Sequence, residues 1–116
     1  MRLDAEEILR LVLHRLDDMK AEDTITINLR DRSSIGDYMV VSSGRSNRHV
    51  GSVADRVLED LREAGVHAQV EGMPHCDWVL IDAGDVIVHV FRPEVRTFYN
   101  IEKMWSRGRS VTLQAS

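Results

Sequence analysis

The sequence has few of the residues that cross-link a chain or anchor it in a membrane. A single cysteine, Cys76, excludes any disulfide within the chain and is typical of a reducing compartment. We expect Cys76 to be a small, half-buried filler rather than a nucleophile. No apolar run approaches the roughly 20 residues of a membrane helix, and MRLDAEEILR lacks the apolar stretch of a signal peptide. We therefore expect a cytoplasmic protein without a membrane partner.

The chain also lacks an excess of basic residues. It has 15 Lys and Arg against 19 Asp and Glu, a net charge of -4. Nucleic-acid-binding proteins usually carry a basic face, because neutralising phosphates supplies most of their affinity. Broad RNA or DNA binding is therefore disfavoured, although a local basic stripe stays open.

The length of the chain sets its domain organisation. With 116 residues, 43% of them hydrophobic, the chain is long enough for one domain with one core.

Apolar periodicity predicts two long helices. Asp4 and Glu7 form a capping-box pattern, and apolar residues then recur at helical spacing to about Lys20. Ser46 is the expected N-cap of the second helix, and Gly65 is its expected C′ residue. The predicted buried stripes are Ile8, Leu11, Val12, Leu16 and Met19 in the first helix and Val50, Val53, Ala54, Val57, Leu58 and Leu61 in the second.

Five segments have the pattern of β-strands. Residues 24–29 and 38–42 precede the second helix, and residues 66–70 follow it, which predicts a right-handed crossover and a parallel pair. Residues 77–91 add a hairpin, and Pro93 begins a last helix through Trp105. The order α-β-β-α-β-β-β-α predicts an α/β (α+β) fold, a mixed five-stranded sheet with packed helices. We expect residues 1–105 to form the domain and residues 106–116 a loose tail.

The hairpin segment, DWVLIDAGDVIVHVF, has two faces of different character. We predict a two-residue turn at residues 83–84, which places Asp82 opposite Asp85. In the same register Trp78 faces His89. Side chains alternate along a strand, so the first face is wholly aliphatic and is the predicted core face: Val79, Ile81, Val86, Val88 and Val90. The second face is mixed: Trp78, Leu80, Asp82, Asp85, Ile87, His89 and Phe91.

The mixed face allows two interpretations. Helices could cover it, with the aspartates beside a hydrated turn. Alternatively, it is an exposed apolar patch with an acidic rim, the usual composition of a docking site. Six acids and two bases lie between Glu71 and Glu102, which favours a basic protein partner. We adopt docking as the leading hypothesis, and solvent exposure of Trp78 tests it.

Sequence patterns for catalysis are weak. No histidine among His14, His49, His67, His75 and His89 forms a recognised metal-binding spacing with another ligand residue. No G-x-S-x-G elbow surrounds the serines at positions 42, 43 and 46. The Gly-x-Ser turn before the second helix is similar to that of nucleotidyltransferases, but no two aspartates are separated by one residue. We expect no catalytic residue, metal or cofactor, and we keep a nucleotide-dependent enzyme as the alternative.

Four segments carry a resemblance to a known family: DYMVVSSGRSNRHV, ADRV, EGMPHCDWVLIDAGDVIVHVF and PEVRTFYNIEKMW. From about Ile8 to Trp105 the chain resembles the ribosomal silencing factor family, also called Iojap-like proteins. The resemblance implies a nucleotidyltransferase-like fold without the catalytic carboxylates. It also implies binding to the large ribosomal subunit through the ribosomal protein L-fourteen. Bound there, such a protein would block subunit joining and repress translation when nutrients are short.

The resemblance leaves a second role open, because some relatives are linked to assembly of the large subunit, and homodimers occur among them. The absence of an Arg-rich transit peptide favours a bacterial member. The partner-binding residues would be the anchor Trp78 and Leu80, the acids Asp82 and Asp85, and, from the last helix, Tyr99 and Glu102. Arg96 either joins this surface or braces it from inside.

Overall fold

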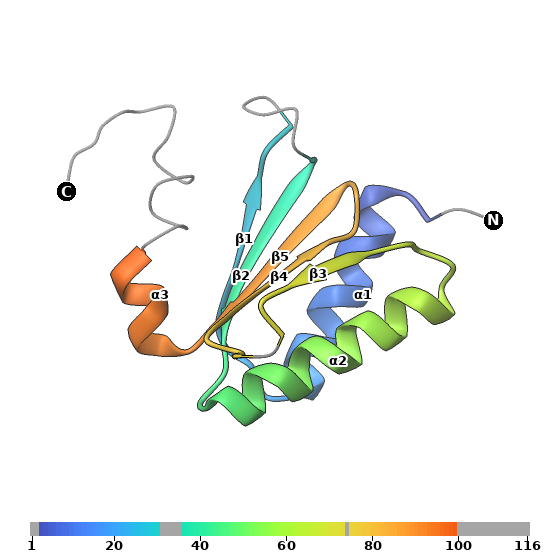
Figure 1. Ribbon diagram of the computed structural model, residues 1–116. Helices are drawn as coiled ribbons and strands as arrows, with labels where there is room; N and C mark the ends of the chain where they lie inside the picture. The colour runs from blue at the N-terminus through green and yellow to red at the C-terminus, as the bar shows by residue number, and fades with distance from the viewer. Residues whose placement is uncertain (1–2, 31–35, 74, 100–116) are drawn as a thin grey trace.

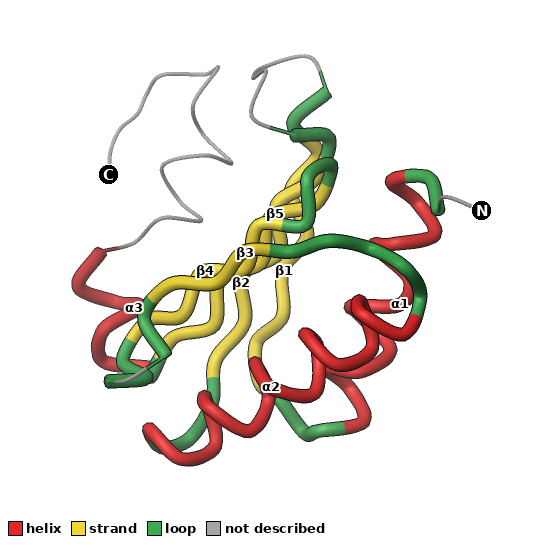
Figure 2. Tube along the Cα trace, turned by 45° about the vertical axis from the view of Figure 1, so that its right-hand side comes forward, coloured by secondary structure: helices red, strands yellow, loops and turns green. Residues whose placement is uncertain are grey.

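The computed structural model describes residues 3–30, 36–73 and 75–99. Its elements follow the predicted order: α1 (Ala5–Asp18), β1 (Glu22–Asn28), β2 (Tyr38–Ser43), α2 (Asn47–Glu63), β3 (Gln69–Glu71), β4 (Trp78–Asp82), β5 (Val86–Phe91) and α3 (Pro93–Tyr99). The five strands form one mixed sheet in the order β1-β2-β5-β4-β3. Helices α1 and α2 lie side by side on one face of the sheet, and α3 lies on the other side (Figures 1 and 2). The predicted fold class is confirmed.

The helix ends form as the local sequence predicts. The Asp4 carboxylate accepts from the amide of Glu7 at 2.9 Å, and the Glu7 side chain accepts from the amide of Asp4 at 2.9 Å. The Ser46 hydroxyl accepts from the amide of His49 at 3.1 Å and caps α2. Gly65 follows the helix with φ +80°, a conformation that a side chain disfavours. Short-range capping chemistry therefore fixes where both helices begin and where α2 ends.

Two apolar clusters hold the sheet between its helices. The larger one lies between the sheet and α1 and α2, and it contains the whole predicted core face of the hairpin, with Val79, Ile81, Val86, Val88 and Val90 each fully buried. The smaller cluster lies on the opposite face. Its buried members are Ile27, Leu29, Met39, Val41 and Phe91, and Trp78 and Val95 pack against them. The second face is thus partly packed, which bears on where a partner can bind.

The predicted pairing across the α2 crossover is wrong. β2 has β5 as its parallel neighbour, and β3 lies at the far edge of the sheet, beyond β4. Strand β3 is also shorter than predicted, since it begins only at Gln69. Val66 and Ala68 lie before the strand and pack against the larger cluster. A central position for β2 explains why all six of its residues are buried, since both its edges and both its faces are covered.

The predicted register of the hairpin is also wrong. The amide of Ala83 donates to the carbonyl of Val86 at 2.9 Å, so Gly84 and Asp85 form the turn. Asp82 therefore pairs with Ile87 and not with Asp85. The whole register moves by two residues, so each side chain keeps its predicted face while its partner changes. Gly84, at φ +88°, occupies the position in this turn that requires glycine.

Candidate docking surface

Strands β3 and β4 bring two apolar and two acidic side chains together on the face away from α1 and α2. Trp78 and Leu80 are half-buried, whereas Glu71 and Asp82 are exposed. Glu71 pairs with Leu80 across the two strands and shares its face, and Asp82 lies two residues further along β4. We call these four residues the docking surface. Glu71 was absent from the predicted site residues, because only the pairing of β3 with β4 places it there.

The indole of Trp78 is held in place by two residues of β5. Its Nε1–H donates to Nδ1 of His89 at 2.9 Å. Its ring stacks on that of Phe91, with centroids 5.0 Å apart and an interplanar angle of 25°. Trp78 pairs directly with Phe91. His89, which was its predicted cross-strand partner, is instead its diagonal neighbour. Trp78 is thus an oriented, incompletely covered aromatic group, and the outcome that would have ended the docking hypothesis, a fully buried indole, does not occur.

His89 serves as the hydrogen-bond acceptor for this tryptophan. Its side chain is 6% exposed, and burial lowers its pKa from 6.5 to about 4. The ring is therefore neutral at pH 7. Because Nδ1 accepts from the indole, the ring proton is on Nε2. A protonated His89 would have no free acceptor, so protonation removes the hydrogen bond to Trp78.

We expect acid to destabilise the fold through His89. Between pH 6.5 and about 4 the unfolded chain binds a proton at this residue that the folded chain does not. Stability from this group is complete above pH 6.5 and falls by about 3 kcal/mol as the pH drops to 4. Urea unfolding at a series of pH values measures this loss. The variant His89→Gln keeps an acceptor but does not titrate. Equal pH slopes in the two proteins would contradict the assignment.

The start of β4 is fixed by polar contacts among Asn47, His75, Asp77 and Arg92, which we call the clasp. Asn47, at the beginning of α2, donates through Nδ2 to the carbonyl of His75 and to Oδ1 of Asp77, both at 2.8 Å. The Nε of Arg92 lies 3.1 Å from the same Oδ1. This Nε–H is buried without an aligned acceptor, so the contact is an ion pair rather than a hydrogen bond. The amide of Arg92 also donates to the carbonyl of Asp77 at 3.0 Å, so the clasp anchors the residue before Trp78.

Removing the Asn47 amide is expected to cost stability. Asn47→Ala deletes two hydrogen bonds that join α2 to the loop before β4, and we expect a loss of about 1–2 kcal/mol in the free energy of unfolding. Arg48→Ala, an exposed neighbour in the same helical turn, is the matched control and should change stability by less than about 0.5 kcal/mol. Chemical denaturation measures both. Equal losses would show that the clasp contributes nothing.

The other predicted site residues do not all join the docking surface. Asp85 lies in the β4–β5 turn and lines a cavity beside α1, away from Trp78. Tyr99 lies in α3, its side chain outside the described part, and Glu102 lies outside the described residues. Arg96 is 7% exposed and donates from Nη1 to the Ser43 hydroxyl at 2.8 Å, which confirms the interpretation as an internal brace.

Cys76 agrees with its predicted role as a half-buried filler. Its thiol packs against the larger cluster and donates to the carbonyl of Met73 at 2.6 Å. Burial, followed by the charges of Asp55 and Asp77, raises the pKa of the thiol, which makes the nucleophilic thiolate scarcer. Across the described ranges no group of three or more His, Cys, Asp and Glu residues could hold a metal ion. No described helix is long and apolar enough to span a membrane.

Comparison with known proteins decides the family. Residues 2–116 match the model of a family described as the ribosomal silencing factor during starvation. The chain belongs to the ribosomal silencing factor family. A relative from Zymomonas mobilis, named ribosomal silencing factor RsfS, is 51% identical over 90% of this chain and 80% of its own length.

Two further comparisons show the breadth of the likeness. A crystal structure of a Chromobacterium violaceum protein superposes with a TM-score of 0.87 at 38% identity, covering 98% of this chain and 92% of that one. A mouse protein, named mitochondrial assembly of ribosomal large subunit protein 1, is 28% identical over 74% of this chain and 40% of its own length. The family match therefore spans the stretch of chain that forms the described fold.

Proposed function

We propose that this protein is a silencing factor that binds the large ribosomal subunit in the bacterial cytoplasm and keeps the small subunit from joining it. The observation that carries the proposal is the docking surface. Trp78 and Leu80 are oriented apolar groups that are only half-buried, and Glu71 and Asp82 beside them are exposed acids. Oriented aromatic anchors at the centre of an interface supply most of its binding energy. The names of the silencing-factor relatives support a ribosomal partner.

The charge of the surface favours a basic partner. Among the described residues, neither Glu71 nor Asp82 has a cationic side chain within ion-pair distance. We infer that they pair with basic residues of the ribosomal protein L-fourteen, with Trp78 and Leu80 filling an apolar depression between them. Exposed charge pairs of this kind speed association and set orientation, whereas the apolar centre determines the lifetime of the complex.

The mechanism requires no catalysis and no cofactor. A protein bound where the two subunits meet excludes the small subunit by its volume. Repression then depends on the fraction of large subunits that are occupied, which the protein concentration and the dissociation constant determine. Silencing during nutrient shortage would follow from a rise in that fraction.

The partner is tested by titrating the labelled protein separately with large subunits, small subunits and purified L-fourteen protein. We expect saturable binding to the large subunit and to L-fourteen, and none to the small subunit. Affinity for L-fourteen should fall with added salt, because the acidic rim contributes to the encounter. Binding to the large subunit with none to L-fourteen would reject that partner, and binding to neither would reject the proposal.

A second candidate role is assembly of the large subunit, which the name of the mouse relative favours. The same docking surface would serve, but the partner would be an immature particle. A strain without the protein distinguishes the two roles. Precursor particles that accumulate during growth in rich medium would support assembly, whereas normal particles with excess translation in starvation would support silencing.

A further inference from the structure

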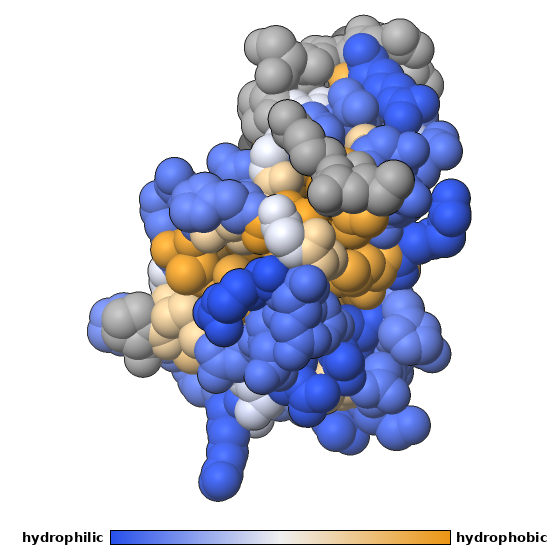
Figure 3. Space-filling view, turned by 90° about the vertical axis from the view of Figure 1, so that its right-hand side faces the viewer, coloured by the Kyte–Doolittle hydropathy of each residue, from blue (hydrophilic) through white to orange (hydrophobic). Residues whose placement is uncertain are grey.

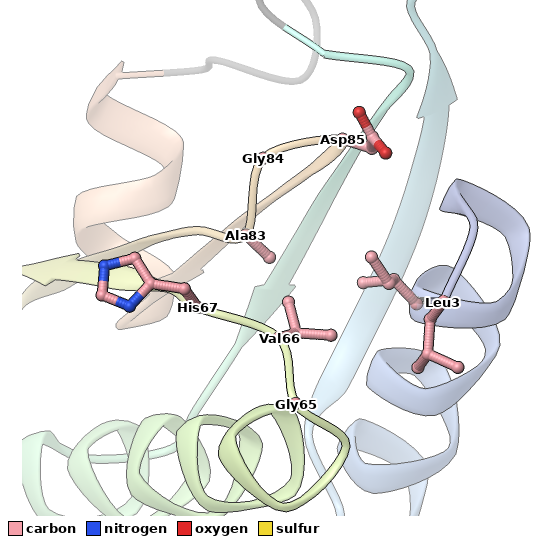
Figure 4. Close-up of a pocket in the computed structure, with 8 residues that line it drawn as sticks. Leu3, Gly65, Val66, His67, Ala83, Gly84 and Asp85 are labelled. Carbon is pink, nitrogen blue, oxygen red and sulfur yellow. The ribbon is translucent and has the colours of Figure 1, made fainter. Parts of the chain in front are cut away.

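A cavity of about 370 Å³ lies at the end of the molecule where α1 begins, on the side of the sheet that carries the helices. Apolar side chains from three separate segments form its walls: Leu3 just before α1 and Ile8 in its first turn, Val66 after α2, and Ala83 just after β4 (Figure 4). Its volume is in the range of cavities that take small ligands or anchoring side chains of peptides. The docking surface contributes no residue to it.

The rim of the cavity has one acidic and one imidazole side chain among its lining residues, Asp85 and His67. The carboxylate of Asp85 lies at its edge (Figure 4), and the amide of Asp37 donates to the carbonyl of Asp85 at 2.7 Å, which places a second acid nearby. The first turn of α1 has two exposed acids, Glu6 and Glu7, which do not line the cavity. Arg30 lies 3.8 Å from Glu6 and 3.7 Å from Asp37 and so pairs with both acids, whereas Asp85 has no ion pair among the described residues.

The surface view of this end agrees with that composition. Figure 3 looks at the molecule from the side on which α1 begins, and it shows apolar atoms gathered in the middle with hydrophilic atoms around them. Leu3 and Val66 are half-buried, so the apolar walls reach the surface, while Ile8 is 4% exposed and forms the floor. An apolar depression with an unpaired carboxylate at its edge is complementary to an apolar side chain that lies next to a basic residue.

We propose that this cavity is a second binding site, which takes an apolar side chain of a basic peptide segment in a partner protein. The apolar side chain enters between Leu3, Val66 and Ala83. A lysine or arginine beside it in the peptide pairs with Asp85. The site lies apart from Trp78 and requires no ribosome. A test of this site is therefore independent of the proposed silencing function.

The test uses the full chain, labelled with nitrogen-15, and a capped hexapeptide of two lysines, two leucines and two lysines. At about 1 mM peptide we expect shifts of the amide signals of Gly65, Val66 and Gly84. Exchanging the leucines for serines should weaken binding roughly ten-fold, because burial of the anchor is lost. Exchanging the lysines for glutamates should abolish it.

Two matched variants separate this site from the docking surface. Asp85→Asn removes the charge at the cavity and should weaken peptide binding about three-fold. Asp82→Asn removes a charge three residues away that faces the docking surface, and it keeps the acceptor for the amide of Gly84. It should leave binding unchanged. Equal effects of the two variants, shifts confined to the amides around Trp78, or no shifts at all would overturn the proposal. So would the same shifts on raising protein concentration without peptide, because the occupant would then be a second copy of this chain.

Discussion

Replacing Trp78 with alanine is expected to weaken binding to the large ribosomal subunit by about 30-fold or more. The substitution removes the aromatic anchor of the docking surface, and truncations of such anchors typically cost more than about 2 kcal/mol of binding free energy. Glu71 and Asp82 remain in Trp78→Ala, so the encounter still occurs, and the loss should lie mainly in faster dissociation. Titration of labelled protein with purified large subunits measures it.

The control for this variant must separate binding from folding. Ile25→Ala removes an apolar side chain that is 40% exposed on the same face of the sheet, but on the opposite edge strand, β1. We expect it to bind as the unchanged protein does. The free energy of unfolding of both variants shows whether either effect arises from instability. Unchanged affinity in a folded Trp78→Ala protein would show that the partner binds elsewhere.

Replacing Phe91 with alanine is expected to give the largest loss of stability. Phe91 is fully buried in the smaller apolar cluster and stacks on both Trp78 and His89, with centroids 5.0 Å and 5.9 Å away. Its removal leaves a cavity beneath the docking surface, and phenylalanine-to-alanine changes in cores typically cost about 3–5 kcal/mol. Urea or thermal unfolding measures the change.

The Phe91→Ala variant also tests how the docking surface is supported. The indole of Trp78 loses its stacking partner but keeps its hydrogen bond to His89, so its fluorescence should change while the variant is still folded. Val70→Ala, on the edge strand β3 and 37% exposed, is the control and should cost less than about 1 kcal/mol. A loss as small for Phe91→Ala would contradict the packing of the smaller cluster.

The parts of the fold that the sequence predicts well depend on contacts between near neighbours. The capping pair of Asp4 and Glu7 lies three positions apart, and Ser46 caps α2 through His49, also three positions away. The core face of the hairpin was also predicted, because alternation assigns faces even when pairing is mistaken. Moving the turn by one residue shifts the pairing by two and returns every side chain to its face.

The errors of the sequence-based prediction concern contacts between segments that are far apart in the chain. Glycine fits more than one position of a hairpin turn. Here it takes the first central position, where the Asp82 carboxylate accepts its amide at 2.9 Å. The local sequence of β2 does not determine whether this strand pairs with β5 or with β3, because both strands run parallel to it. For the same reason the contact of Asn47 with Asp77, 30 positions apart, and the place of Glu71 beside Leu80 have no signal in the sequence.

The most direct test of the proposed function is a subunit-joining measurement. Purified large subunits are incubated with the protein or with Trp78→Ala, small subunits are added, and joining is followed by light scattering and by sedimentation. The proposed function predicts that joining falls as the protein occupies the large subunits, and that at equal concentration Trp78→Ala leaves joining nearly normal. Normal joining while the unchanged protein co-sediments with the large subunit would contradict it, because the protein would then bind without blocking the contact between the subunits.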